Sequence, residues 1–154
     1  MPELNHLKVD PIDEDLLVYE WRALNGYAFL MRRNKAVYLH RVVLERVLGR
    51  ALMPGEVADH INRDRLDNRR ENLRAATPSQ SLANRAKRAG LSSRFLGVNY
   101  ITRGSGRTKR WRAYVTKNGE QVSAGYFSTE IEAARARDEL ARQILGEFAV
   151  LNNV

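Results

Sequence analysis

The sequence predicts an α+β protein in which small antiparallel sheets and single helices form two domains. Three observations carry this prediction. A motif-rich segment, Val57–Asn84, ends well before the chain does. Short strand-like runs precede it, and alternating runs followed by one long helical pattern come after Arg94. Since 154 residues can form two small cores, we expect a first domain over residues 1–86, a basic linker over 87–93 and a second domain over 94–154.

Composition excludes several classes of protein. The chain has no cysteine and three histidines, which argues against a disulfide framework and a Cys-rich or His-rich zinc site. No signal-peptide pattern and no run of about 18 apolar residues occurs, so we expect a cytoplasmic protein with no membrane partner.

The charge of the chain is unevenly distributed. The net charge is +8, and the stretch from Asn72 to Gly119 contains eleven basic residues and no acidic one. A solvated basic surface is one interpretation of this stretch. Contact with a nucleic-acid backbone is the other, and the neighbouring motif favours it.

The first forty residues predict an extended leader followed by a small sheet. Residues 1–14 contain two prolines and four acids, a composition typical of an extended leader. An Asn-Gly pair suits a two-residue hairpin turn. The expected strands are Leu16–Trp21, Tyr27–Arg32 and Lys35–His40, separated by Asn25-Gly26 and Arg33-Asn34. We interpret Trp21, Tyr27 and Phe29 as core residues, with stacking platforms as the alternative.

A helix is predicted over His40–Leu48 and ends at Gly49. Its expected buried face consists of Val43, Leu44, Val47 and Leu48. We interpret His40 as structural, with a phosphate contact as the alternative. A Pro-Gly turn then leads into a strand over Val57–His60.

The adjacent pair Asp59 and His60 suits phosphodiester hydrolysis. A carboxylate can hold a hard cation, and an imidazole can take a proton from water near neutral pH. Asn72 follows twelve residues later, and its side-chain carbonyl could accept Nδ1–H of His60, which would leave Nε2 to act as the base.

The sequence around this pair resembles the His-Asn-His (HNH) endonucleases, in particular their phage and intron homing branch. The resemblance is carried by the run V-A-D-H-I-N-R-D-x-L-D-N-R-R-E-N-L-R-x-A-T and by L-H-R before it. The resemblance covers about Tyr38–Arg85. It implies a ββα-metal fold with two short strands and a helix that closes over the metal.

The same resemblance assigns roles to residues. Asp59 would be a metal ligand, His60 the general base and Asn72 its orienting partner. Where relatives carry a second metal-binding Asn, this chain has Ser81, and Asn84 one turn later matches a recurrent family Asn. The implied cofactor is a divalent metal, Mg²⁺ or Mn²⁺, with Ser81 and Asn84 as further candidate ligands.

The second domain is predicted to be a three-stranded antiparallel sheet packed on one helix. The expected strands are Phe95–Ile101, Arg110–Thr116 and Gln121–Phe127. Thr129 with Glu132 forms a capping box for a helix that runs to about Leu145. Alternation along the middle strand turns Trp111, Ala113 and Val115 toward the helix.

Over about Ser92–Asn152 the sequence resembles the apetala-type (ethylene-response-factor) DNA-binding domain. Four elements carry this resemblance: S-S-R-F-x-G-V, W-R-A-Y-V, G-Y-F-S-T-E-x-E-A-A-R-A-R-D and G-E-F-A-x-L-N. That family places its sheet in the major groove of DNA. The expected DNA contacts in the linker and sheet are Lys87, Arg88, Arg94, Asn99, Arg110, Arg112, Tyr114, Thr116, Gln121 and Ser123.

Together the two resemblances imply a phage-type homing or free-standing endonuclease of a bacterial host that nicks double-stranded DNA as a monomer, with a dimer on DNA as the alternative. A rival hypothesis is a DNA-binding regulator or recombination accessory that has lost cleavage, because of Ser81. A third is an RNA-directed nuclease, which the sheet domain disfavours.

Overall fold

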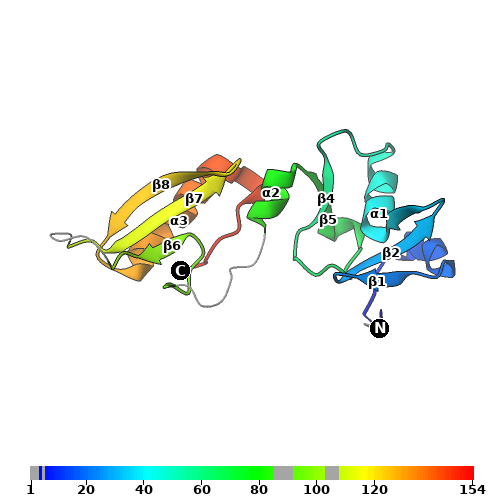
Figure 1. Cartoon of the computed structure of the whole chain (residues 1–154), viewed down its shortest axis with the longest axis horizontal. Helices are drawn as coiled ribbons and strands as arrows, with labels where there is room; N and C mark the ends of the chain where they lie inside the picture. Colours follow the sequence, from blue (N-terminus) through cyan, green and yellow to red (C-terminus); the bar gives the residue numbers. More distant parts are fainter. Residues whose placement is uncertain (1–3, 5, 85–91, 103–107) are drawn as a thin grey trace. The chain divides into compact units, whose positions relative to one another are not determined.

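The structure is a computed structural model that describes residues 4, 6–84, 92–102 and 108–154. It divides into two compact units, Met1–Pro78 and Ser79–Val154, which Figure 1 shows with their helices and strands labelled. The predicted linker over residues 87–93 falls mostly outside the described residues, as does the expected turn at 103–106. Within the described residues, no helix is long and apolar enough to cross a membrane.

The first unit contains a three-stranded antiparallel sheet in the order β1-β2-β3. Two-residue turns join the strands, and Asn25 and Gly26 have φ angles of 52° and 81°, the left-handed region that an Asn-Gly turn readily adopts. The strands are β1 (Arg22–Leu24), β2 (Tyr27–Arg32) and β3 (Lys35–Tyr38). The small antiparallel sheet expected here is therefore present.

The prediction of a strand over Leu16–Trp21 was wrong. The chain forms a 3-10 helix, η1, over Pro11–Val18 instead. Pro11 favours this conformation, since its fixed φ and missing N–H suit the first helical position. The Trp21 indole N–H then donates to the Leu16 carbonyl at 2.7 Å, which fixes the chain before β1 begins.

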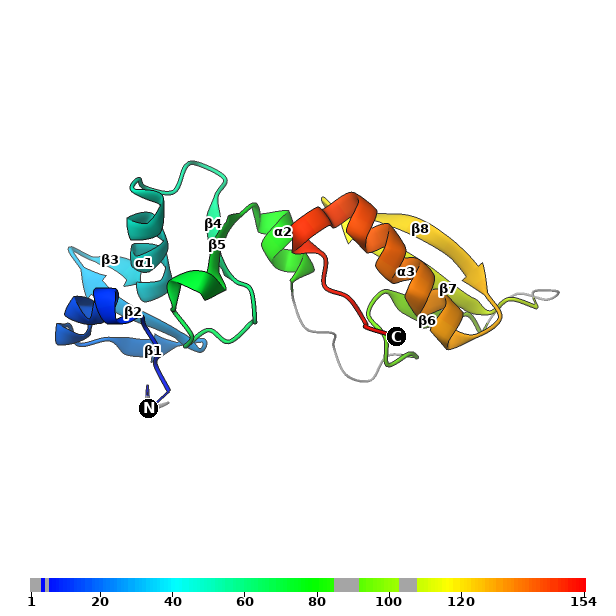
Figure 2. The same cartoon turned by 180° about the vertical axis from the view of Figure 1, so that it is seen from behind.

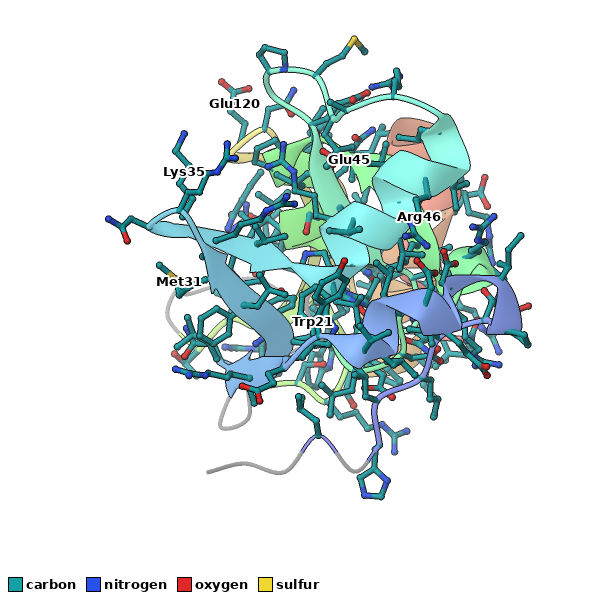
Figure 3. The ribbon with its side chains drawn as sticks, turned by 90° about the vertical axis from the view of Figure 1, so that its right-hand side faces the viewer. Trp21, Met31, Lys35, Glu45, Arg46 and Glu120 are labelled. Atoms are coloured by element: carbon teal, nitrogen blue, oxygen red, sulfur yellow. The ribbon has the colours of Figure 1, made fainter. Side chains whose placement is uncertain are left out.

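The N-terminal segment is also integrated into the fold, contrary to the expected extended leader. Asp13 has an exposed fraction of 0%. Its carboxylate accepts hydrogen bonds from Arg70 Nε at 2.7 Å, Arg70 Nη2 at 3.0 Å and Arg46 Nη1 at 3.2 Å. Asp10 Oδ2 accepts the backbone N–H of Arg70 at 2.6 Å. Figure 3 shows Arg46 on the helix that faces η1.

Helix α1 (Leu39–Leu48) begins within the run predicted as the third strand, which shortens β3 by two residues. Gly49 ends the helix with a φ of 65°. Leu39, Val43 and Leu44 are buried, but Val47 and Leu48 are exposed, so the buried face of α1 lies closer to its N-terminus than predicted. This face packs in one core with Leu16, Ala28, Leu52 and Leu73.

The motif segment forms a two-stranded antiparallel sheet of β4 (Val57–His60) and β5 (Leu73–Ala76). The register places Asp59 opposite Arg74 and His60 opposite Leu73. A short 3-10 helix, η2 (Arg70–Asn72), leads into β5. The connection from Ile61 to Arg69 is irregular, and it carries Asn68, whose side chain contacts His60.

The second unit contains a three-stranded antiparallel sheet, β6-β7-β8, and a long helix, α3. Helix α3 lies across one face of this sheet, behind it in Figure 1 and in front of it in Figure 2. Thr129 and Glu132 form a capping box at its start. The elements are α2 (Pro78–Ala83), β6 (Val98–Tyr100), β7 (Trp111–Lys117), β8 (Glu120–Phe127), α3 (Glu130–Leu145) and η3 (Gly146–Phe148).

Strand β6 is shorter than predicted because of Gly97. This residue has a φ of 69°, and a Cβ there would collide with the carbonyl oxygen of Tyr114. Only glycine suits this position, so regular pairing with β7 begins at Val98. Val98, Ala113, Ala133 and Ala134 form the core between sheet and helix, and the small alanines let the helix lie close to the strands.

The burial of Asp13 leads to a stability prediction. Asp13→Ala removes the carboxylate and leaves the guanidinium groups of Arg46 and Arg70 without this partner. Breaking a buried ion pair in this way should lower the free energy of unfolding by roughly 3 kcal/mol. The measurement is urea unfolding of the first unit, followed by Trp21 fluorescence in a Trp111→Phe background.

Asp15→Ala is the matched control for this experiment. Asp15 binds the same Arg46, but its side chain is 60% exposed, so its loss should leave the unfolding midpoint almost unchanged. Equal destabilisation by the two variants would contradict the structural role of Asp13.

Candidate active site

Asp59 and His60 lie at the end of β4, where the strand gives way to the irregular connection. The exposed fractions of Asp59 and His60 are 6% and 5%. Asp59 Oδ2 accepts a hydrogen bond from Arg74 Nε at 3.1 Å, across the β4–β5 pair. The strand geometry therefore places a paired carboxylate beside a shielded imidazole.

Burial lowers the pKa of His60 from its ordinary value of 6.5, and this effect exceeds the opposing influence of Asn68 and the nearby carboxylates. The imidazole is consequently neutral at pH 7. A neutral imidazole has one nitrogen without a proton, which is the state that a general base requires.

The environment of His60 is aromatic. The ring centroid of His40 lies 5.0 Å from that of His60, and the centroid of Tyr27 lies 5.9 Å from it. Burial and the neighbouring His60 lower the pKa of His40 to about 3. Among the described residues, Nδ1 of His40 is buried without a hydrogen-bond partner. His40 thus packs against the candidate base as a neutral ring. The Arg65 guanidinium lies over Tyr27, 4.6 Å from the centroid of the Tyr27 ring.

The expected hydrogen bond from His60 Nδ1 to Asn72 is not present. Asn72 Oδ1 accepts the backbone N–H of Asn62 at 2.9 Å, and its Nδ2 donates to the Asp67 carbonyl at 2.7 Å. The side chain of Asn72 therefore joins two parts of the irregular connection, at Asn62 and at Asp67. Instead, Asn68 Oδ1 lies 3.3 Å from His60 Nε2. The asparagine that contacts His60 is therefore Asn68 and not Asn72, and the nitrogen that it contacts is Nε2 and not Nδ1.

Asp67 stabilises the same connection. Its buried carboxylate accepts hydrogen bonds from Arg69 at 2.8 Å and from Asn62 Nδ2 at 3.0 Å. The Arg69 hydrogen bond lowers the pKa of Asp67 from 3.8 to about 2. The run D-N-R-R-E-N-L in the sequence contained the signal for Asp67 and Asn68, but sequence spacing alone did not distinguish Asn68 from Asn72.

The candidate metal ligands are divided between the two units. Asp59 belongs to the first unit, whereas Ser81 on α2 and the buried Asn84 after it belong to the second. Among the described residues, no group of three or more His, Cys, Asp and Glu side chains is placed to hold a metal ion. The described donor at β4 is a single carboxylate, which suits a hard cation but fills only part of its coordination shell.

The expected DNA contacts of the sheet lie on one face of β6-β7-β8. Residues directly opposite in antiparallel strands share a face, and the register places Asn99 opposite Arg112, Tyr114 opposite Ser123 and Thr116 opposite Gln121. Ala113 and Val115 alternate with these residues and are buried against α3, as alternation predicted.

Sequence reasoning missed Tyr126 on this face. A register shift near Ala113 and Tyr114 brings Tyr126 opposite Arg112, and its side chain is exposed. The Arg112 guanidinium lies 5.1 Å from the Tyr114 ring centroid, so arginine and two tyrosines form the centre of the face.

The remaining expected contacts lie at the margins or outside the described part of the chain. Arg110 precedes β7 and its Nη1 donates to the Ile101 carbonyl at 3.5 Å. The exposed Arg94 lies 4.8 Å from the Phe95 ring centroid. Lys87 and Arg88 lie outside the described residues.

Comparison with known proteins adds to this geometry. A family model described as HNH endonuclease matches residues 37–83, which include β4, β5 and α1. A protein of Acanthamoeba polyphaga mimivirus, named as an uncharacterized HNH endonuclease, is 30% identical over 137 residues, or 88% of this chain and 68% of the viral protein. Since 137 residues exceed the first unit, the similarity extends into the second. No solved structure gives a significant match.

Asp67 leads to a prediction about acid stability. Because its pKa is lower in the folded state, its contribution to stability is complete above the unfolded value of 3.8 and is lost as the pH falls through about 2. The urea midpoint of the first unit should therefore fall from pH 4 to pH 2, and it should fall less in Asp67→Asn. An equal fall in both proteins would show that Asp67 is not one of the groups responsible.

Proposed function

The chain belongs to the HNH endonuclease family, and we propose that it is a DNA endonuclease whose first unit hydrolyses phosphodiester bonds and whose second unit binds duplex DNA. The observation that carries the proposal is the shielded, neutral His60 beside the Asp59 carboxylate at the end of β4.

In the proposed reaction His60 takes a proton from a water molecule, whose oxygen attacks phosphorus. The bond from phosphorus to the leaving O3′ breaks, which gives 5′-phosphate and 3′-hydroxyl ends. Burial supports this role because it keeps the imidazole neutral and ready to accept the proton. Arg74, which is held by Asp59, adds a positive charge beside the place where a phosphate would bind.

HNH nucleases generally use a divalent metal, and Asp59 is the residue that would hold it here. When bound, the metal would neutralise charge on the phosphate and on the leaving oxygen. Phosphate oxygens and water would complete its shell, and Ser81 and Asn84 are the further ligands that the family resemblance suggests. Because a hydroxyl is a poorer ligand than an amide carbonyl for a hard cation, we expect weak metal binding without DNA.

The second unit would direct this chemistry to DNA. Its outward face presents arginine, tyrosine, asparagine and glutamine side chains, which can contact phosphates and base edges in the major groove. The resemblance to the apetala-type domain supports the same role. We place the protein with the phage-type homing nucleases in the cytoplasm of a bacterial host, acting as a monomer that nicks one strand.

A DNA-binding protein without cleavage is the second candidate. Ser81 at the expected ligand position favours it, as does the hydrogen bond that engages Asp59 with Arg74. A nicking assay distinguishes the two candidates.

We expect wild-type protein to nick supercoiled plasmid slowly, and faster with Mn²⁺ than with Mg²⁺, since Mn²⁺ binds a given oxygen site more tightly. His60→Ala should abolish nicking and leave DNA affinity near that of wild type. Ser81→Asn should raise the rate. Cleavage by His60→Ala at the wild-type rate would exclude His60 as the base, and no cleavage by wild type or Ser81→Asn with any divalent metal would establish the binding protein.

The sheet face leads to a separate prediction about affinity. Arg112→Ala should weaken duplex binding and reduce the slope of log K against log salt by about 1 if Arg112 contacts a phosphate. Arg142→Ala is the matched control, because Arg142 is an exposed arginine on α3 that pairs with Glu139. Equal losses in the two variants, measured by fluorescence anisotropy, would exclude the β6-β7-β8 face as the DNA-binding surface.

A further inference from the structure

We propose that Asn68 is the positioning residue of the candidate base, because its side-chain oxygen accepts Nε2–H of His60 and so selects one tautomer of the imidazole. The inference rests on the proposed function in one respect, the assignment of His60 as the base. It differs from the expectation drawn from the sequence, in which Asn72 accepts Nδ1–H and Nε2 is the basic nitrogen.

The orientation of the Asn68 amide carries the first step. Its Nδ2 donates to the carbonyl of Leu66 at 3.1 Å, so the oxygen is the end of the amide that faces His60. The distance from this Oδ1 to His60 Nε2 is 3.3 Å. Because an amide oxygen only accepts hydrogen bonds, Nε2 must carry the hydrogen in the neutral ring.

The second step is the rigidity of Asn68. Its exposed fraction is 0%. Its backbone N–H donates to the Lys8 carbonyl at 2.8 Å, and the Lys8 N–H donates to Leu66 at 2.9 Å. Rotating the amide would bring Oδ1 against the carbonyl oxygen of Leu66 and leave Nδ2 without this acceptor. Such a buried mismatch costs about 1–3 kcal/mol, which is enough to select one orientation.

The consequence concerns the path of the proton. With hydrogen on Nε2, the unprotonated nitrogen of neutral His60 is Nδ1, so Nδ1 receives the proton from water. The resulting imidazolium carries hydrogen on both nitrogens, and Asn68 Oδ1 continues to accept Nε2–H. The same hydrogen bond therefore orients the neutral ring and stabilises the charged one.

Asn72 provides a matched comparison within the same connection. Both asparagines are buried, and the side chain of Asn72 holds a backbone N–H and a carbonyl. Of these two asparagines, Asn68 is the one whose side chain contacts His60. Asn68→Ala and Asn72→Ala should thus both loosen the connection, whereas Asn68→Ala alone should change the tautomer.

The experiment is ¹⁵N NMR of full-length protein labelled at its histidines, in which two-bond proton–nitrogen correlations identify the protonated nitrogen of each neutral ring. Assignment uses His6→Gln and His40→Gln. We expect the Nε2–H tautomer for His60 in wild type, in Asn72→Ala and in Asn68→Asp, which retains an acceptor oxygen. We expect mixed tautomers in Asn68→Ala.

Single-turnover cleavage, with the protein in saturating excess over DNA, supplies the second measurement. The rate constant in Asn68→Ala should fall by about 10-fold or more, up to the 10²–10⁴-fold that a positioned general base contributes, while the protein concentration that gives half the maximal rate stays near its wild-type value. Asn68→Asp should recover part of the rate.

An Nδ1–H tautomer in wild type would overturn the proposal, and so would an unchanged tautomer in a folded Asn68→Ala. If Asn68→Ala does not fold, the wild-type spectrum and Asn68→Asp still decide between the alternatives. The NMR measurement requires no cleavage, so failure of the positioning inference is distinguishable from failure of the nuclease assignment, which the plasmid assay tests.

Discussion

The first unit depends on one buried carboxylate. Asp13 is fully buried and receives hydrogen bonds from Arg46 on α1 and from Arg70 on η2, two guanidinium groups that lie far from it in sequence. Removing a charge from water is costly unless the geometry of its partners is good, and the paired arginines hold the pKa of Asp13 below its ordinary value. The hydrogen bonds of Asp13 therefore fix η1, α1 and η2 together.

This constraint reaches the candidate base through the backbone. Lys8 forms backbone hydrogen bonds with Leu66 and Asn68 in the irregular connection, and Asp10 accepts the backbone N–H of Arg70 at the start of η2. Asn68 in turn contacts His60. A segment that the sequence predicted to be an extended leader thus sets the position of an amide beside the imidazole. Loss of the N-terminal segment should affect the geometry around His60 as well as stability.

The features that the sequence predicted correctly are those that depend on nearby residues. The Asn25-Gly26 turn, the strand Val57–His60 and the capping box of Thr129 with Glu132 each follow from a local rule and occur at the predicted positions. Alternation along β7 also separated its buried and outward residues, because the period of a strand is two.

The features that could not be predicted depend on contacts between distant residues. Helix η1 is held by Arg46 and Arg70 through Asp13, and no local pattern in the sequence connects these three residues. Gly97 interrupts its strand because of the carbonyl of Tyr114, and the choice between Asn68 and Asn72 depends on how residues 61–72 fold back on themselves. Spacing identified the type of residue that the site requires, but hydrogen bonding decides which of two asparagines contacts His60.

The Asp59–Arg74 pair bears on how the site would acquire a metal. Asp59 Oδ2 is held by Arg74 at 3.1 Å, with side-chain exposures of 7% and 15%, so a cation that binds this oxygen competes with a guanidinium. A DNA phosphate is a strong acceptor for arginine, and it also offers oxygens to the metal. Arrival of the phosphate would therefore weaken the hold of Arg74 on Asp59 while it supplies ligands that one carboxylate lacks. For the proposed nuclease, DNA and metal would therefore bind cooperatively, and the metal affinity of the protein alone would understate its affinity in the complex.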